Sequence, residues 1–175
     1  MSVRLPLDIR PVRIEELDKL RILARETFIT AFGPHNTAEN MDAYVSKHFS
    51  KGYFEQLYRS PGSLFFLAYR GEKAIAYLKL NIEKAQNEQL LDNSIEIERI
   101  YVHENYQGQG YGQDLLDFST VYGRQLNKDW IWLGVWDQNQ GAIRFYERHG
   151  FTTFSQHDFY LGDELQIDWL MKRRL

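Results

Sequence analysis

The stretch from Ile95 to Gln113 combines a run of β-branched and aromatic residues with three closely spaced glycines. Its first eight residues read I-E-I-E-R-I-Y-V, which is typical of a buried strand. Gly108, Gly110 and Gly112 follow at alternate positions, and apolar residues then recur at helical spacing. The stretch therefore predicts a strand, a glycine turn and the first turns of a helix.

A glycine turn that opens a helix suits an anion. The first N–H groups of a helix lack internal partners, the helix dipole makes this end partly positive, and glycine lets the backbone approach a ligand closely. These properties predict a phosphate or pyrophosphate site. Two common motifs do not fit, because Gly112 is not followed by the lysine of a Walker A loop and Gln113 replaces the third glycine of a dinucleotide fingerprint. A purely structural turn is the alternative interpretation.

Two motifs in this order resemble the GCN5-related N-acetyltransferase (GNAT) superfamily. Residues 107–112, Q-G-Q-G-Y-G, fit its acetyl-CoA signature [QR]-x-x-G-x-[GA], and residues 139–151 match its second signature, N-x-x-A-x-x-F-Y-x-x-x-G-F. The phrases I-E-I-E-R-I-Y, I-W-L-G-V-W and F-Y-L-G-D-E are similar to the PaiA-type spermidine/spermine N-acetyltransferases, and this likeness runs over nearly the whole chain. The resemblance implies an acetyl-CoA-dependent N-acetyltransferase of GNAT fold.

Composition narrows the class of protein. The 175 residues, of which 43% are apolar, are enough for one domain over 1–175 with a substantial core. The absence of cysteine excludes disulfides, zinc thiolate sites and a cysteinyl acyl intermediate. A net charge of −3 does not indicate a nucleic-acid partner, and no apolar run approaches the ~18 residues that span a bilayer. We expect a cytoplasmic protein with a small-molecule amine as its partner, without a membrane, and with a homodimer as an allowed assembly.

The hydrophobic pattern predicts an α+β fold. By resemblance this is a mixed, mostly antiparallel sheet of six to seven strands with helices on both faces and one splayed parallel pair. The expected strands are 8–12 at an edge, 64–69, 73–82, 95–102, 130–136, 151–160 and 164–172, the last two joined around Gly162-Asp163. The expected helices are 15–32, a second one capped by Thr37 and interrupted at Gly52, a short one after Gly52, 112–126 and 139–149. Residues 83–93 are expected to form a loop.

The resemblance also implies a cofactor site. The pantetheine arm of acetyl-CoA would lie in the gap between the splayed strands and pair with the backbone of Ile100 and Val102, and the pyrophosphate would rest on amides 107–112. Arg148 would reach the 3′-phosphate, with a solvent-exposed helix face as the alternative. The full expected set is Ile100, Tyr101, Val102, Gln107, Gly108, Gln109, Gly110, Tyr111, Gly112, Gln113, Asn139, Tyr146 and Arg148, in which Asn139 also serves as a helix N-cap.

The chemistry needs an acid and a base. By resemblance Tyr146 hydrogen-bonds the CoA sulfur and protonates the leaving thiolate; the alternative is a core aromatic residue. An alkylammonium has a pKa of ~10.4, so deprotonation at pH 7 costs about 4.5 kcal/mol unless the site assists. Glu96 matches the base glutamate of family histone acetyltransferases and Glu98 is the second candidate, with solvent-facing alternation as the alternative. Without cysteine, direct attack of the amine in a ternary complex is the most economical mechanism.

The acceptor end is the least determined by sequence. The resemblance places it between the first two helices and the final hairpin, and spaced carboxylates there would suit a polyamine such as spermidine or spermine. The candidates are Glu26, Glu39, Asp42, Asp158 and Asp168, for each of which a solubilising role is the alternative. No histidine pair has metal-binding spacing, so no metal is expected. The rival hypotheses are a protein or peptide N-acetyltransferase with an open groove, and a CoA-binding regulatory protein without turnover.

Overall fold

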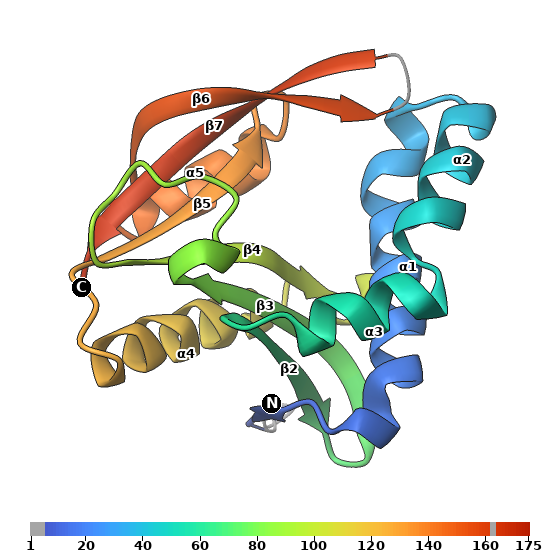
Figure 1. Cartoon of the computed structure of the whole chain (residues 1–175), viewed down its shortest axis with the longest axis horizontal. Helices are drawn as coiled ribbons and strands as arrows, with labels where there is room; N and C mark the ends of the chain where they lie inside the picture. Colours follow the sequence, from blue (N-terminus) through green and yellow to red (C-terminus); the bar gives the residue numbers. More distant parts are fainter. Residues whose placement is uncertain (1–5, 162–163) are drawn as a thin grey trace.

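The computed structural model describes residues 6–161 and 164–175, and a seven-stranded sheet organises them (Figure 1). The strand order is β1-β2-β3-β4-β5-β7-β6, and neighbouring strands are antiparallel except for the parallel pair β4 and β5. The strands are β1 (Asp8–Pro11), β2 (Ser63–Arg70), β3 (Lys73–Ile82), β4 (Ser94–Val102), β5 (Trp130–Trp136), β6 (Thr152–Leu161) and β7 (Glu164–Arg174). The predicted mixed sheet is confirmed, whereas the expected turn at Gly162-Asp163 lies outside the described residues.

Helices cover both faces of this sheet (Figure 1). One apolar cluster joins α4 (Tyr111–Gln125) and α5 (Gln140–Arg148) to one face, and a second joins α1 (Leu17–Phe32), α2 (Ala38–His48) and α3 (Lys51–Arg59) to the other. The side chains of β2 alternate between the two clusters, because successive residues of a strand point to opposite faces. The described residues contain no helix long and apolar enough to cross a membrane.

The boundary between α2 and α3 differs from the prediction. Thr37 caps α2 as expected, since its side chain accepts a hydrogen bond from the Asn40 amide at 3.2 Å. The interruption at Gly52 is wrong, because Ser50 accepts from the Tyr53 amide at 3.3 Å and starts α3 one residue before the glycine. Gly52 therefore lies in the first turn of α3, where it has ample space.

The parallel pair opens toward its carboxyl end. Its ladder runs from Ser94 opposite Trp130 to Ile97 opposite Leu133 and goes no further, although both strands continue. Beyond Leu133, β5 pairs only with β7, and β4 pairs only with β3. The two strands thus separate at the level of Glu98 and Gly134, which confirms the predicted splay.

A β-bulge at Glu98 reverses the alternation of β4. Lys79 of β3 faces Arg99, but Leu80 faces Ile97, so Glu98 is an extra residue without a partner position. Ile97 packs in the cluster with α4, and after the bulge Ile100 does so as well. Arg99 instead lies against Phe49 and Phe54 on the opposite face. The bulge therefore brings several charged side chains of β4 to the face that α1–α3 cover.

Candidate active site

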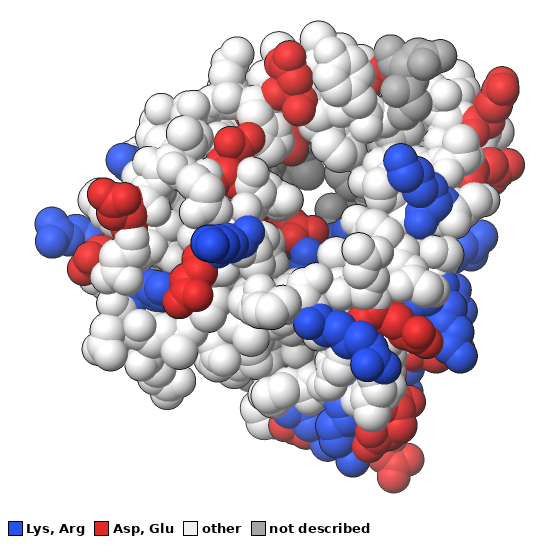
Figure 2. Space-filling view, in the orientation of Figure 1, with Lys and Arg blue, Asp and Glu red and all other residues white. Residues whose placement is uncertain are grey.

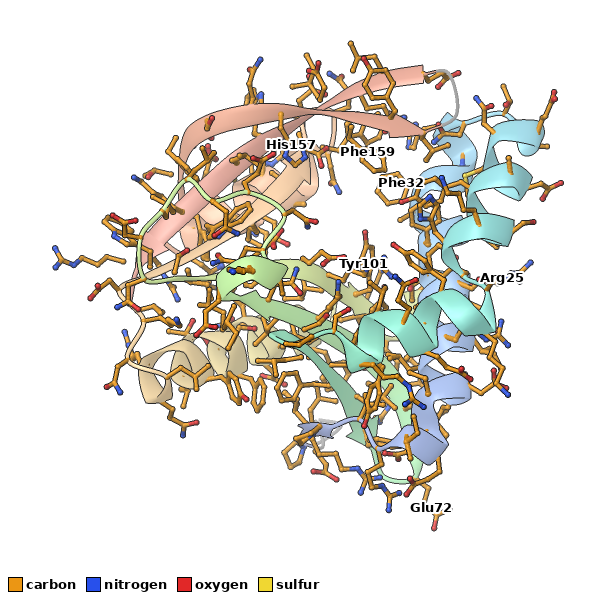
Figure 3. The ribbon with its side chains drawn as sticks, in the orientation of Figure 1. Arg25, Phe32, Glu72, Tyr101, His157 and Phe159 are labelled. Carbon is orange, nitrogen blue, oxygen red and sulfur yellow. The ribbon has the colours of Figure 1, made fainter. Side chains whose placement is uncertain are left out.

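A cleft of about 1320 Å³ crosses the molecule at the splay of β4 and β5. Its lining comes from α1, α2, β4, the glycine turn, β5, α5 and the β6–β7 pair. Figure 2 shows this face hollowed between the β6–β7 arm and the helices. In Figure 3, His157 and Phe159 lie on one side of the opening, with Phe32 and Tyr101 across from them. Segments far apart in sequence thus meet at one site.

The glycine turn has the geometry of an anion site. Gly108 and Gly110 adopt positive φ angles of +71° and +84°, and Gly110 is the N-cap of α4. This conformation directs the start of the helix at the cleft, where the dipole favours negative charge. The amide of Gln107 is different, because it donates to the Glu104 carbonyl at 3.2 Å within a tight turn. Of the amides 107–112 that were expected to bind the pyrophosphate, those that follow Gln107 therefore remain as candidates.

Most of the expected cofactor residues line this cleft. Those that do are Ile100, Tyr101, Val102, Gln107, Gly108, Gly110, Tyr111, Gly112, Gln113, Asn139, Tyr146 and Arg148. Gln109 does not line it, and its side chain instead donates to the Asn105 carbonyl at 3.3 Å. Asn139 caps α5 by accepting from the Ala142 amide at 3.1 Å. The open strand pair and the helix start together fit an elongated ligand with a phosphate group.

The Gln107 side chain occupies part of the expected pantetheine path. Its amide nitrogen donates to the Val102 carbonyl at 3.0 Å. This carbonyl is one of the backbone groups that the resemblance assigns to the pantetheine arm. Gln107 is exposed, so its side chain can swing away without opening the core. A ligand amide at Val102 would replace the glutamine amide with one of the same hydrogen-bonding type.

Tyr146 lies at the base of the cleft on α5. The residue is only 8% exposed. Its ring packs edge-to-face against the rings of Phe145 and Phe151, with centroid distances of 5.3 and 5.8 Å. Burial raises the pKa of its phenol above the ordinary value. At neutral pH the group is therefore a protonated hydrogen-bond donor at a fixed position, the form that a proton donor to a thiolate needs.

Glu96 is buried and fully engaged by protein donors. Its carboxylate accepts from the side chain of Asn81 at 3.0 Å, and from the amide and side chain of Asn87 at 2.8 and 2.7 Å. The alternative of solvent-facing alternation is wrong, since this residue is 3% exposed. Burial raises the pKa of Glu96, and the hydrogen bonds from the two asparagines oppose that effect. Glu96 ties residues 83–93 to β4.

Glu98 belongs to an ion-pair network on the same face. Its carboxylate contacts the Lys79 ammonium, accepts from Asn81 at 2.6 Å and lies 3.4 Å from the Arg99 guanidinium. Burial disfavours the charged carboxylate, but Arg99 and Lys79 outweigh it and hold the pKa of Glu98 below its ordinary value. Glu98 is therefore ionised at neutral pH and already has two cationic partners.

Sequence reasoning missed the partners of these glutamates, although signals for some existed. Lys79 and Asn81 are polar residues at alternate positions within an otherwise apolar strand, which predicts a polar face there. The apolar positions of β4 change from 95 and 97 to 100 and 102, which is the mark of an extra residue. Asn87 lies in a loop without periodicity, and nothing in the sequence marks it.

The acceptor-side part of the cleft is rich in aromatic side chains. Phe28 stacks on Tyr44 at a centroid distance of 4.9 Å, and Tyr44 meets Phe159 of β6 edge-on at 6.1 Å. Trp136 of β5 contacts the ring of His35 at 5.0 Å. These rings come from α1, α2, β5 and β6, so the wall forms only in the folded chain. Aromatic faces of this kind attract alkylammonium groups.

The structure divides the expected acidic residues into two sets. Asp158 and Asp168 line the cleft. Glu26 instead lines a neighbouring cavity of about 360 Å³ together with His103 and Glu104. Glu39 and Asp42 are exposed on α2 and do not line the cleft, because Met41, Tyr44, Val45 and His48 form its inward stripe. The helical spacing of that stripe could have shown this from sequence.

A histidine between two carboxylates completes the acceptor side. His157 of β6 lies directly opposite Asp168 of β7, with its Nε2 3.7 Å from the Asp168 carboxylate. Its Nδ1 lies 3.2 Å from the carboxylate of Glu88, which reaches across from residues 83–93. Asp168 raises the pKa of His157, Glu88 adds to this effect, and partial burial opposes it. Sequence reasoning identified Asp168 but neither His157 nor Glu88.

Comparison with known proteins gives consistent results. The family model described as Acetyltransferase (GNAT) family matches residues 24–151. The chain is 41% identical over 170 residues to an uncharacterized N-acetyltransferase in the pepI 3′ region of Lactobacillus delbrueckii subsp. lactis, covering 95% of this chain and 98% of that protein. It is also 32% identical over 72 residues to the spermine/spermidine N(1)-acetyltransferase of Bacillus subtilis, covering 41% of this chain and 47% of that protein.

A solved structure shares the fold over the whole chain. The crystal structure of PaiA N-acetyltransferase from Thermoplasma acidophilum, in complex with coenzyme A, superimposes with a TM-score of 0.77 at 23% sequence identity. The match covers 98% of this chain and 100% of that one. At this identity the likeness establishes the arrangement of sheet and helices, and the chemistry has to be argued from the residues of this chain.

Proposed function

Since the chain belongs to the acetyltransferase (GNAT) family and is an acetyl-CoA-dependent N-acetyltransferase, we propose that its acceptor is a polyamine such as spermidine or spermine. The observation that carries the proposal is the combination of carboxylates and aromatic faces around the acceptor side of the cleft. A primary ammonium gains from both, through ion pairing with Asp168 or Glu88 and through contact with ring faces. The short likeness to the Bacillus subtilis enzyme supports the same class of acceptor.

The site residues follow from this proposal. The pantetheine arm of acetyl-CoA lies between the separated ends of β4 and β5, along Ile100 to Val102, and displaces the Gln107 side chain. The pyrophosphate lies at the start of α4, and Arg148, exposed at the cleft, meets the 3′-phosphate. These contacts deliver the thioester to the level of Glu98 and Gly134, where the strands part.

Acetyl transfer then needs no covalent enzyme intermediate. The amine nitrogen attacks the thioester carbonyl in a ternary complex, the C–S bond breaks, and the Tyr146 hydroxyl gives its proton to the leaving thiolate. The nitrogen loses a proton as the amide forms, and this proton restores the Tyr146 hydroxyl through water. Glu96 and Glu98 are the candidates for the base that acts on the ammonium through water. Glu98 is the more accessible of the two, because its side chain is 17% exposed whereas Glu96 is held by both asparagines.

A peptide or protein acceptor is the second candidate. A peptide site needs an open groove in which unpaired strand edges bind the main chain. At the splay the inner edges of β4 and β5 are unpaired beyond Ile97 and Leu133, so this feature is present. In our proposal the pantetheine arm of acetyl-CoA occupies those edges. The carboxylates beside them favour a small cation as the acceptor.

A thiol-release assay decides between these acceptors. Acetyl-CoA is offered with spermidine, spermine, free amino acids and short peptides, and free CoA is measured. We expect release with the polyamines and none with the peptides. Release with peptides alone would assign the peptide activity instead. We also propose a cytoplasmic enzyme that is a monomer or a homodimer. Light scattering on the purified protein distinguishes these two assemblies.

A further inference from the structure

We propose that Asp168 binds the reacting ammonium and takes its proton, and that His157 passes this proton to Glu88 at the edge of the cleft. The inference deepens the proposed function, but it rests only on an amine acceptor and not on a polyamine. Asp168 touches the substrate in this scheme and is a catalytic residue. His157 and Glu88 act through it and are positioning residues.

Asp168 lies where the two substrates must meet. Gly134 is the first residue of β5 beyond the ladder with β4. A methyl group built at Gly134 would lie 3.6 Å from the Asp168 carboxylate. Since position 134 carries no side chain, the carboxylate overlies the open end of the splay directly. An amine held by Asp168 is therefore adjacent to a thioester delivered between the strands.

The three neighbouring strands set this arrangement. Trp136 of β5 is opposite Asp168 of β7, and Asp168 is opposite His157 of β6. Residues in register across a sheet share one face, so these side chains form a row. The row faces α1 and the turn that follows it, because Trp136 contacts Phe32 and His35 there. His157 thus stands on the acceptor side of the sheet, next to Asp168.

Residues 83–93 bring the third group into place. Gln86 accepts hydrogen bonds from Trp132 at 2.7 Å and from Ser94 at 2.9 Å, which fixes this loop over β5 and β4. Glu88 follows two residues later and lies 3.2 Å from His157. The Glu88 side chain is 36% exposed, compared with 21% for Asp168. The three groups therefore lead from the cleft toward solvent.

The ammonium N–H bond breaks as an O–H bond forms on Asp168, and the freed lone pair attacks the thioester carbonyl. As the C–S bond breaks, a second N–H proton leaves the attacking nitrogen and, through water, replaces the proton that Tyr146 gives to the thiolate. Asp168 then gives the proton to Nε2 of a neutral His157, whose Nδ1 proton goes to Glu88 and from there to water. The charges that act on His157 within the described chain are those of Asp168 and Glu88, and they raise its pKa above the ordinary value. An imidazole has two ring nitrogens and can accept a proton at one while it donates a proton from the other.

The other carboxylates of the cleft are less suited to this role. Glu96 accepts from Asn81 and Asn87, and Glu98 is paired with Lys79 and Arg99. Either would have to give up protein contacts to hold an ammonium. The ion-pair partner of Asp168 among the described residues is His157, which can lose its own positive charge. The ammonium can then take the place of that charge beside Asp168.

The test compares variants of the row with matched controls outside the cleft. The assay uses the amine that the wild type uses best and the variants Asp168→Asn, His157→Gln and Glu88→Gln. The pH runs from 5.5 to 9.5, a range of ~4 pH units that includes the ordinary His pKa. Asp42→Asn and Glu39→Gln remove the same kinds of charge from the exposed face of α2. We expect His157→Gln to lower kcat about tenfold to a hundredfold at pH 7 and to remove the acid limb of the kcat profile.

The remaining measurements distinguish the binding of the amine from the transfer of its proton. We expect Asp168→Asn to raise the KM for the amine and to lower kcat, with the KM for acetyl-CoA unchanged. Added imidazole should restore part of the activity of His157→Gly, and both α2 controls should match the wild type. A histidine titration by NMR should show a lower pKa for His157 in Asp168→Asn, a readout that does not depend on activity.

Several results would overturn the relay. These are a wild-type acid limb in His157→Gln, an unchanged His157 pKa in Asp168→Asn, or an acid limb lost only in Glu98→Gln. Glu88→Gln changes a partly exposed group and keeps the test valid if His157→Gln does not fold. If the wild type uses peptides and not polyamines, the polyamine proposal fails, and the same series with that peptide still decides the relay.

Discussion

The side-chain oxygen of Gln86 accepts a hydrogen bond from the indole nitrogen of Trp132 at 2.7 Å, in the interior between residues 83–93 and β5. The same oxygen accepts from the Ser94 hydroxyl at 2.9 Å. One glutamine therefore holds the loop that carries both Asn87 and Glu88. Together with the two hydrogen bonds from Asn87 to Glu96, this glutamine orders this side of the cleft.

Replacing this glutamine should loosen the loop. Gln86→Leu leaves the Trp132 indole N–H buried without an acceptor, which costs about 1–3 kcal/mol of stability, whereas the Ser94 hydroxyl keeps the Leu91 carbonyl as its acceptor at 2.8 Å. Urea unfolding measures this loss, and hydrogen exchange should show faster exchange at residues 83–93. Lys84→Leu, which changes an exposed side chain of the same segment, is the control. Unchanged exchange in Gln86→Leu would contradict this role.

Tyr146→Phe should separate catalysis from binding. The change removes only the hydroxyl of a buried ring, so the packing against Phe145 and Phe151 remains. We expect kcat to fall about tenfold to a hundredfold, as for the loss of a general acid, with CoA affinity nearly unchanged. Steady-state kinetics and calorimetric titration with CoA measure the two effects. Tyr160→Phe changes an exposed tyrosine of β6 and should match the wild type; equal kcat in both variants would remove Tyr146 from the chemistry.

Gly110→Ala should weaken cofactor binding and stability together. Gly110 has φ +84° at the N-cap of α4, and an alanine in this left-handed region is strained by roughly 1–2 kcal/mol. A shift of the turn to relieve that strain would move the amides to which we assign the phosphates, so we expect CoA to bind about tenfold more weakly. Gly52→Ala is the control, because Gly52 is helical and uncrowded, and it should be about 0.5–1 kcal/mol more stable. Wild-type CoA affinity in Gly110→Ala would argue against a phosphate site at this turn.

Glu16 should make the fold sensitive to acid. Hydrogen bonds from Arg13 at 3.2 Å and from the Tyr69 hydroxyl at 2.7 Å lower the pKa of this carboxyl to about 2, although its burial opposes the shift. A carboxyl whose pKa is lowered on folding stabilises the protein above its unfolded pKa of ~4.3, and this contribution is lost as the pH falls through the folded pKa. Arg13 is largely exposed, so screening limits the effect to roughly 1–2 kcal/mol.

The measurement for Glu16 is thermal unfolding at several pH values. Glu16→Gln should be less stable than the wild type near pH 7, and the difference should shrink between about pH 4 and pH 2. Glu15→Gln is the control, since Glu15 is exposed in the same turn. A difference between Glu16→Gln and the wild type that stays constant across this range would show that lost packing, and not charge, is responsible.

Much of the fold follows from local patterns in the sequence. The strands β3 and β5 begin and end where periodicity predicts, because each is an apolar run bounded by polar turn residues. Thr37 and Gly150 act at the ends of helices through properties of their own side chains and backbone, which need no tertiary context. Such elements are predictable because the determining interactions are within a few residues.

The acceptor side of the site is not predictable in this way. His157 and Asp168 meet because β6 and β7 pair in one register, and Glu88 reaches them because a buried glutamine fixes its loop. These contacts join residues far apart in the chain, so no spacing in the sequence reveals them. The cofactor turn was predictable because strand, glycines and helix are consecutive, whereas the acceptor wall is assembled from separate segments.

The extra residue at Glu98 also limits how this protein can change over time. Before Glu98 the odd-numbered residues of β4 support α4, and after it the even-numbered ones do. Deleting the codon for Glu98 would leave Ile100 and Val102 on the α4 side, because Ile97 and Arg99 already lie opposite adjacent residues of β3. Deleting the codon for Ile100 would instead turn Tyr101 toward α4 and Val102 away from it. The strand can therefore shorten by one residue at the bulge, but beyond it only if both surfaces are rebuilt at once.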